Sequence, residues 1–377
     1  MLIPLSFLLP LQLLFTASPS LQTQPQGTLH RREYFYVGEN YVNTPGTNNG
    51  SQIAAGQVYV EHLVPARVTQ SLPILMIHGH GMTGTNFLNT PDGRLGWADY
   101  LMAAGFEIYL IDQPSRARSA WQMGVDGDQS DFDTTYVASH FSAPEKFNLW
   151  PQSALHTQWP GNGTPGDPIF DNFYASTMPS LNSDEESSIK VKAAVGKLLD
   201  NIGPVILLTH SQSGQYGWIL GDFKPSLVKT IIAVEPIGPP FINAVFPPLT
   251  PARPFGMTEI PIAFSPPISS ASDLKIEVNP ALTNASLGTT CFRQVNPPRQ
   301  MVNLVGIPTL LVTSQAGYHA IYDDCSVDFL TEAGVPVTHV RLEDVGIFGN
   351  GHMMFMEKNN LEIAEKVVLD WIQRTIH

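Results

Sequence analysis

The chain has 377 residues, of which 43% are hydrophobic and 14% are charged, and its formal net charge is −13 at pH 7. This length allows a large buried core without a disulfide framework or a structural metal, so one domain with insertions is expected. The acidic balance argues against nucleic acid and anionic membrane surfaces as partners, because binding to phosphates depends on lysine and arginine.

The N-terminus has the pattern of a secretory signal peptide over residues 1–20. Residues 2–15 are mostly Leu, Ile, Phe and Pro, a run too short to span a bilayer, and Ser18-Pro19-Ser20 offers a cleavage site. No later run reaches 18 apolar residues, so no membrane anchor is expected. The sequence therefore predicts a secreted, extracellular protein whose mature domain covers residues 21–377.

A secreted protein can be N-glycosylated and can form disulfides, and the sequence has candidate residues for both. Acceptor triplets for N-glycosylation begin at Asn49, Asn162 and Asn284. The chain has two cysteines, Cys291 and Cys325, which we expect to form a disulfide in an oxidising compartment. The alternative is a pair of free buried thiols.

Strands and helices alternate along most of the chain. Residues 34–37 and 57–64 are expected to form antiparallel leading strands. Further buried strands are predicted at 72–77, 107–111, 230–234, 309–313 and 337–342, and in the run from residue 205 to Ser211. Helices are predicted at 97–104, 184–201 and 359–376. This rhythm predicts an α/β fold with a mostly parallel central sheet and helices on both faces.

Two long segments, at about 121–182 and 239–308, interrupt this rhythm. Long irregular segments inside a compact domain are usually functional lids or disordered linkers. Both leave from the rim of the sheet where the candidate catalytic residues emerge, so we interpret them as a cap. The aromatic side chains of the first segment would line an apolar pocket or form the small core of the cap. They are Phe132, Tyr136, Phe141, Phe147, Trp150, Trp159, Phe170, Phe173 and Tyr174.

The run from residue 205 to Gly214 has the pattern of a nucleophile elbow around Ser211. In such an elbow a tight turn from strand to helix forces a strained backbone on the serine and exposes its hydroxyl above the sheet. Thr209 and Ser213 stand where the usual Gly-x-Ser-x-Gly pattern has glycines. Ser213 is the rival nucleophile, and an ordinary helix N-cap is the structural alternative for Ser211.

The predicted strand 72–77 ends in His78-Gly79-His80-Gly81. A glycine-bearing loop at this place normally supplies half of an oxyanion hole, and we assign the two donors to the main-chain N–H groups of His80 and Gln212. The His-x-His pair lacks a third ligand of matching spacing, so no metal site is predicted. No cofactor is expected.

The candidate general base is His352. It follows the glycine-rich loop 346–351 and lies between the last predicted strand and the closing helix, at the same edge of the sheet as Ser211. A histidine there can take the proton of the serine and pass it to the leaving group. His319 and His339 are the alternative bases.

Glu235, at the tip of the predicted strand 230–234, is the candidate for the acid that orients the base. The more common acid position follows the strand 309–313, but Ser314 and the three residues after it carry no carboxylate. Asp323 and Asp324 come several residues later, in or before a helix, and are the alternative acids.

These motifs together resemble a small group of α/β-hydrolase esterases whose triad acid is a glutamate on the strand after the elbow. The resemblance is carried by the 78–81 loop, residues 90–97 and 111–119, the elbow and Glu235-Pro236. It implies the α/β-hydrolase fold and a triad of Ser211, Glu235 and His352. Members of that group have two adjacent cysteines where this chain has His80 and Gly81, so any special geometry of that pair is absent here.

The resulting hypothesis is a secreted serine esterase or lactonase that acts on a small-molecule ester through an acyl-enzyme. The same fold could support acyl transfer, lactone opening or elimination in secondary metabolism, or a non-catalytic binding protein. The oligomeric state stays open, a homodimer included. Substrate contacts are predicted for Gly81, Arg116, Trp150 and Trp159. For Arg116, as for Asp112 and Arg118, the alternative role is to brace a loop near the site.

Overall fold

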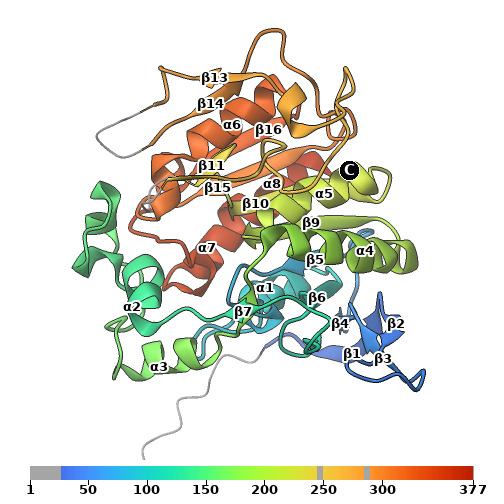
Figure 1. The fold of residues 1–377 in the computed structure, drawn as a ribbon. Coiled ribbons are helices and arrows are strands. Elements are labelled where there is room, and N and C mark those ends of the chain that lie inside the picture. The colour runs from blue at the N-terminus through green and yellow to red at the C-terminus, as the bar shows by residue number, and fades with distance from the viewer. Residues whose placement is uncertain (1–26, 244–248, 284–288, 377) are drawn as a thin grey trace, which may run out of the picture.

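The computed structural model describes residues 27–243, 249–283 and 289–376 (Figure 1). The predicted signal peptide and the triplet at Asn284 lie outside these residues. In the part of the chain that is described, no helix has the length and apolar character needed to cross a membrane.

An eight-stranded sheet forms the centre of the molecule, in the order β1-β4-β6-β5-β9-β10-β15-β16. The pairs β1·β4 and β4·β6 are antiparallel and the other five pairs are parallel, which confirms the predicted fold class. In chain order the strands are β1 (His30–Val37), β4 (Val58–Pro65), β5 (Ile74–Ile77), β6 (Ile108–Asp112), β9 (Val205–Ser211), β10 (Val228–Pro236), β15 (Thr309–Thr313) and β16 (Val337–Arg341).

Helices cover both faces of this sheet (Figure 1). One apolar cluster joins Val205 and Leu207 of β9 to α4 (Asp184–Ile202), α5 (Gly214–Phe223) and α6 (Asp323–Glu332). A second cluster joins Ile206 and Leu208 to α1 (Trp97–Ala103) and the C-terminal helices. Alternate residues of β9 therefore serve opposite faces, and burial of both faces explains why its sequence is apolar throughout.

The predicted C-terminal helix is divided into three parts. They are α7 (Asn360–Ile363), a π-helical turn (Ala364–Leu369) and α8 (Asp370–Thr375). A hairpin of β2 (Asn40–Asn43) and β3 (Gln52–Ala55) between the leading strands was not predicted.

The two long segments contain short elements that periodicity does not reveal. The first holds β7 (Gln129–Ser130), α2 (Thr134–Val137), α3 (Pro168–Ala175) and β8 (Ser180–Leu181). The described part of the second holds β11 (Ile242–Asn243), β12 (Thr250–Pro251), β13 (Ile276–Val278) and β14 (Phe292–Gln294). The short strands pair within their own segment as two-stranded ribbons, β7 with β8, β11 with β12 and β13 with β14.

The predicted disulfide is present. Cys291, just before β14, is bonded to Cys325 on α6, with the two Cα atoms 5.3 Å apart. This bond ties the end of the second segment to a helix of the core. The Asn49 and Asn162 side chains are exposed at the surface.

Candidate active site

Ser211 ends β9 with a φ angle of 58°, in the left-handed region that side chains rarely adopt. Two glycines permit this turn. A Cβ atom at Gly79 would lie 2.8 Å from Cβ of Ser211, and one at Gly214 would lie 2.3 Å from Cβ of Pro236. In the usual motif the glycine that allows the backbone to pass this closely stands two residues after the serine. Here that glycine is Gly214, three residues after Ser211.

Ser213, the rival nucleophile, is fully buried and its hydroxyl is engaged. The hydroxyl lies 2.7 Å from the Ile77 carbonyl, to which it donates, and accepts the His210 N–H at 2.8 Å. The described N-cap residue of α5 is Ser213, so Ser211 does not cap this helix. The hydroxyl of Ser211 is the one that faces a cavity.

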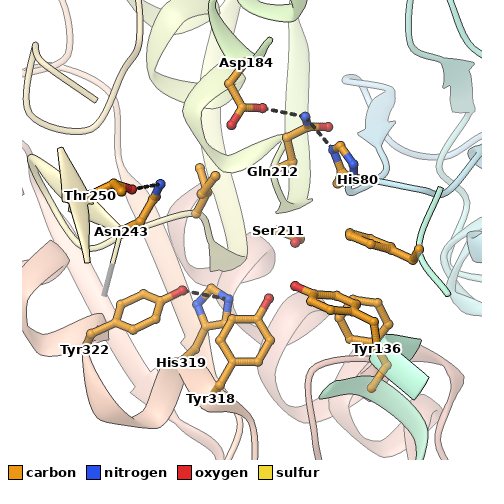
Figure 2. Close-up of a pocket in the computed structure, with 14 residues that line it drawn as sticks. His80, Tyr136, Asp184, Ser211, Gln212, Asn243, Thr250, Tyr318, His319 and Tyr322 are labelled. Carbon is orange, nitrogen blue, oxygen red and sulfur yellow. Dashed lines mark hydrogen bonds between the residues drawn. The ribbon is translucent and has the colours of Figure 1, made fainter. Parts of the chain in front are cut away.

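A cavity of about 390 Å³ opens above Ser211 (Figure 2). The first long segment supplies aromatic side chains to its wall, and the second supplies Asn243 and Thr250. The lining residues are His80, Phe132, Tyr136, Phe141, Asp184, Ser211, Gln212, Ile237, Gly238, Asn243, Thr250, Tyr318, His319 and Tyr322.

The candidate base and acid are hydrogen-bonded to each other. Nδ1 of His352 lies 2.6 Å from Oε2 of Glu235, and both side chains are buried. The other carboxylate oxygen accepts the main-chain N–H of Ser314 at 2.8 Å and also the Ser314 hydroxyl. The position directly after β15 more commonly carries the acid itself. Here it carries Ser314, which donates hydrogen bonds to the candidate acid on the neighbouring strand.

Burial dominates the electrostatics of this pair. Burial raises the pKa of Glu235 to about 7, although the nearby His319 and the hydrogen bonds from Ser314 act in the opposite direction. Burial also lowers the pKa of His352 well below its ordinary value, and His319 and His140 add to that effect. Both shifts disfavour an ion pair and keep the imidazole neutral, as a general base requires.

Tyr318 is a residue of this site that the sequence analysis missed. Its hydroxyl lies 3.3 Å from Nε2 of His352, and the two ring centroids are 4.8 Å apart. The one feature of the sequence that could have indicated Tyr318 is its position in the loop after the predicted strand 309–313, at the same edge of the sheet as Ser211.

The alternative acids and bases form separate contacts. Asp323 accepts from Nδ1 of His319 at 3.1 Å and from the Thr313 hydroxyl at 2.7 Å, and its burial raises its pKa to about 8. Asp324 pairs with Arg341 and lies near His339. Each alternative acid thus has partners other than His352. The His319 ring does stack on His352, with centroids 4.9 Å apart.

The loop after β5 fixes the peptide between Gly79 and His80. The Gly79 carbonyl accepts from Arg116 at 2.8 Å and from Nδ1 of His78 at 2.9 Å. The Gln113 N–H donates to Nε2 of the same His78 ring, which assigns the ring proton to Nδ1. Because a trans peptide directs its C=O and N–H to opposite sides, the His80 N–H points away from Arg116.

The side chains of His80 and Gln212 are coupled to Asp184 (Figure 2). Nε2 of Gln212 donates to Asp184 at 2.6 Å and lies 3.0 Å from Nδ1 of His80, while Arg116 donates to Oε1 of Gln212. Since an amide nitrogen only donates, Nδ1 must accept, and the His80 ring carries its proton on Nε2. Burial, with Arg116 adding, lowers the pKa of His80 to about 3, so the ring is neutral.

Gly81, Arg116, Trp150 and Trp159, for which substrate contacts are predicted, are not among the residues that line the cavity. Arg116 is buried and donates to the Gly79 carbonyl, so it braces the 78–81 loop. The Trp150 indole donates to the Ala316 carbonyl at 3.0 Å, and Trp159 packs against Phe173 in the core. The N–H of Gly81 donates to the Ser180 hydroxyl.

The aromatic side chains of the first segment divide between the cavity wall and the main apolar core, not a separate core of the cap. Phe132, Tyr136 and Phe141 line the cavity. Phe170 and Phe173 are buried in the apolar core, and Phe147 is exposed.

Within residues 27–243, 249–283 and 289–376, the one group that could bridge a metal ion is the candidate acid and base together with His319. One ligand atom each of Glu235, His319 and His352 lies within 4.8 Å of the others. This is the single such group among the described residues. Binding there would break the hydrogen bond between Glu235 and His352, so the observed geometry fits an acid–base pair better than a ligand set.

Comparisons with known proteins identify the family of the chain. A model of the "Alpha/beta hydrolase family" matches residues 74–366. The chain is 46% identical over 350 residues to "Probable secreted lipase phiG" of Fungal sp. (strain ATCC 74256), which covers 90% of this chain and 89% of the relative.

Among solved structures, the chain is similar to that described as "The Atomic Resolution Structure of a Novel Bacterial Esterase". The TM-score is 0.60 at 22% identity, over 95% of this chain and 100% of the bacterial one. At this identity the likeness shows a shared fold.

Proposed function

The chain belongs to the alpha/beta hydrolase family, and from this premise we propose that it is a secreted serine hydrolase that cleaves carboxylic esters of small molecules. One observation carries the proposal. A serine with a strained, left-handed backbone faces a cavity whose wall includes Tyr318. The Tyr318 hydroxyl lies 3.3 Å from Nε2 of a buried histidine, His352, whose Nδ1 lies 2.6 Å from a carboxylate. Nucleophile, base and orienting acid are the parts that acyl transfer to serine needs.

Each residue has a defined role in this mechanism. Ser211 attacks the ester carbonyl, and His352 takes the hydroxyl proton and returns it to the leaving alcohol. Glu235 holds the imidazole in the tautomer with its proton on Nδ1. The main-chain N–H groups of His80 and Gln212 stabilise the oxyanion, and water then releases the acid from the acyl-enzyme.

The substrate belongs to the small esters, lactones included. The cavity of about 390 Å³ lies at the lower end of the usual range for ligand pockets, which is about 300–1,000 Å³. Its wall carries the carboxylate of Asp184 and no lysine or arginine among the lining residues described, which favours an uncharged substrate. The two long segments act as a cap, an assignment supported by the cavity residues that both contribute.

Secretion is supported by the N-terminal pattern, by the disulfide between Cys291 and Cys325, and by the secreted lipase named among the relatives. An extracellular esterase would carry sugar at Asn49 and Asn162, whose side chains are exposed. The remaining triplet, at Asn284, is proposed from the sequence alone.

A fluorophosphonate probe tests the proposal directly. We expect a stoichiometric adduct on Ser211, located by peptide mass spectrometry, and its loss in Ser211→Ala and His352→Ala. Product analysis on an ester panel should then give free acid and alcohol, whereas a new ester would indicate transfer. An unlabelled native protein, or an adduct on Ser213, would overturn the assignment.

A further inference from the structure

The Tyr318 hydroxyl lies between the candidate nucleophile and the candidate base. It points toward Ser211, and both residues line the cavity (Figure 2). On the other side it lies 3.3 Å from Nε2 of His352. One hydroxyl therefore contacts the candidate base and faces the candidate nucleophile, the two groups between which the proton of the first catalytic step must move.

The direction of these hydrogen bonds follows from the protons available. Nδ1 of His352 carries the proton that Glu235 accepts, so Nε2 of the neutral ring has one lone pair and only accepts. Burial, first among several causes, raises the pKa of Tyr318 well above its ordinary value, so the phenol stays protonated and donates to Nε2. Its oxygen carries lone pairs, with which it can accept the proton of Ser211.

The surroundings hold Tyr318 in this position. Its ring packs edge-on against Trp150, with centroids 5.8 Å apart, and the Trp150 indole is anchored on the Ala316 carbonyl. The Ala316 N–H donates in turn to the carbonyl of Asn350, two residues before His352. The tyrosine loop and the histidine loop are thereby joined, which fixes the hydroxyl relative to the base.

We propose that Tyr318 is a catalytic residue that relays the proton between Ser211 and His352, an inference that rests on the function proposed above. As the Ser211 oxygen bonds to the ester carbon, its proton passes to the Tyr318 oxygen while the tyrosine proton passes to Nε2. The imidazolium then returns a proton through the same hydroxyl to the leaving alkoxide. Tyr318 gains and loses one proton in each direction and is unchanged at the end.

The first test needs no variant. When kcat is measured in mixtures of H₂O and D₂O, a transition state in which two protons move gives a curved dependence of kcat on the deuterium fraction. A transition state in which one proton moves gives a straight line. We expect a curve for the native enzyme with an ester that has a poor leaving group. A straight line in an enzyme that labels at Ser211 would overturn the relay while leaving the proposed function intact, and absence of labelling would overturn the function itself.

The matched variants are Tyr318→Phe and, as a control, Tyr109→Phe, which removes a phenol on β6 away from the cavity lining. We expect Tyr318→Phe to lower kcat by about 10²-fold, the low end for general acid–base assistance, and to make the isotope plot linear. The control should keep the native rate and curvature. An unchanged rate in Tyr318→Phe would mean that Ser211 transfers its proton directly. A faster one would mean that the tyrosine competes with the serine for the base, and either result refutes the relay.

Discussion

Nε2 of His156 lies 2.6 Å from Oε1 of Glu357 in the interior of the protein. Its other ring nitrogen, Nδ1, lies 2.8 Å from Glu145, so the imidazole stands between two carboxylates. The carboxylate of Glu357 also accepts the N–H of Gly351, the residue before His352. This contact connects the first long segment to the loop that presents the candidate base.

The first prediction concerns stability against pH. Burial acts to lower the pKa of His156, but the charges and hydrogen bonds of Glu357 and Glu145 outweigh it and raise the pKa to about 9. A raised folded-state pKa stabilises the protein fully below the unfolded value of about 6.5, and this contribution is lost as pH rises toward 9. We expect unfolding by urea to require about 3 kcal/mol less at pH 9.5 than at pH 6 from this group alone.

His156→Gln is the matched comparison, because it retains hydrogen bonding and removes the titration. Its free energy of unfolding should vary less between pH 6 and 9.5 than that of the native chain. Equal pH slopes in the two proteins would show that the His156 cation does not hold the first long segment to the loop that carries His352.

The second prediction concerns the acid. Glu235→Gln keeps the shape of the side chain but no longer favours the imidazole tautomer with its proton on Nδ1, so kcat should fall roughly 10²–10⁴-fold. Asp323→Asn alters the neighbouring pair with His319 and should cost much less. Ester turnover measured side by side decides the matter, and the reverse ranking would transfer the role to Asp323.

The third prediction concerns the dependence of rate on pH. The base must be neutral, and burial lowers the pKa of His352 below its ordinary value of about 6.5. The acid limb of kcat/KM should therefore have its midpoint below pH 6.5. Steady-state kinetics from pH 4 to 8, with stability checked at each pH, would disprove this if the midpoint lay at 7 or above.

The fourth prediction separates the main chain of His80 from its side chain. If the oxyanion donor is the N–H group, which the Arg116 contact to Gly79 orients, His80→Ala retains it. We expect a loss in kcat of less than about 10-fold, well short of the 10²–10³-fold that removal of an oxyanion donor costs. A loss of the larger size would assign the donor to Nε2–H of the imidazole instead.

Local sequence was sufficient to predict those elements whose residue pattern is set by their burial against the core. The run of β9 and the amphipathic pattern of α4 predicted those elements to within a residue or two, since both must contact the core. The turn at Ser211 was recognisable from its small neighbours. Short ribbons such as β7 with β8 carry no such signal, because two residues have no period.

Contacts across long sequence distances could not be predicted. His156 and Glu357 are 201 positions apart, and nothing near either residue indicates the other. The sequence left Arg116 either to brace a loop or to contact substrate, and the partner that decides between these roles, the Gly79 carbonyl, is 37 positions away. Tyr318 escaped notice because its role depends on how two loops meet at the rim.

The backbone turn at Glu235 affects what the loop after β15 must contribute to the site. Glu235 has a φ angle of 40°, and the N–H of Ile237 donates to the carbonyl of Ser211, so the candidate nucleophile and the candidate acid are held together on adjacent strands. The loop after β15 therefore does not need to supply a carboxylate, and it carries Tyr318 and His319 instead. Substitutions in this loop could change the reactivity of the site without altering the backbone of Ser211 or Glu235.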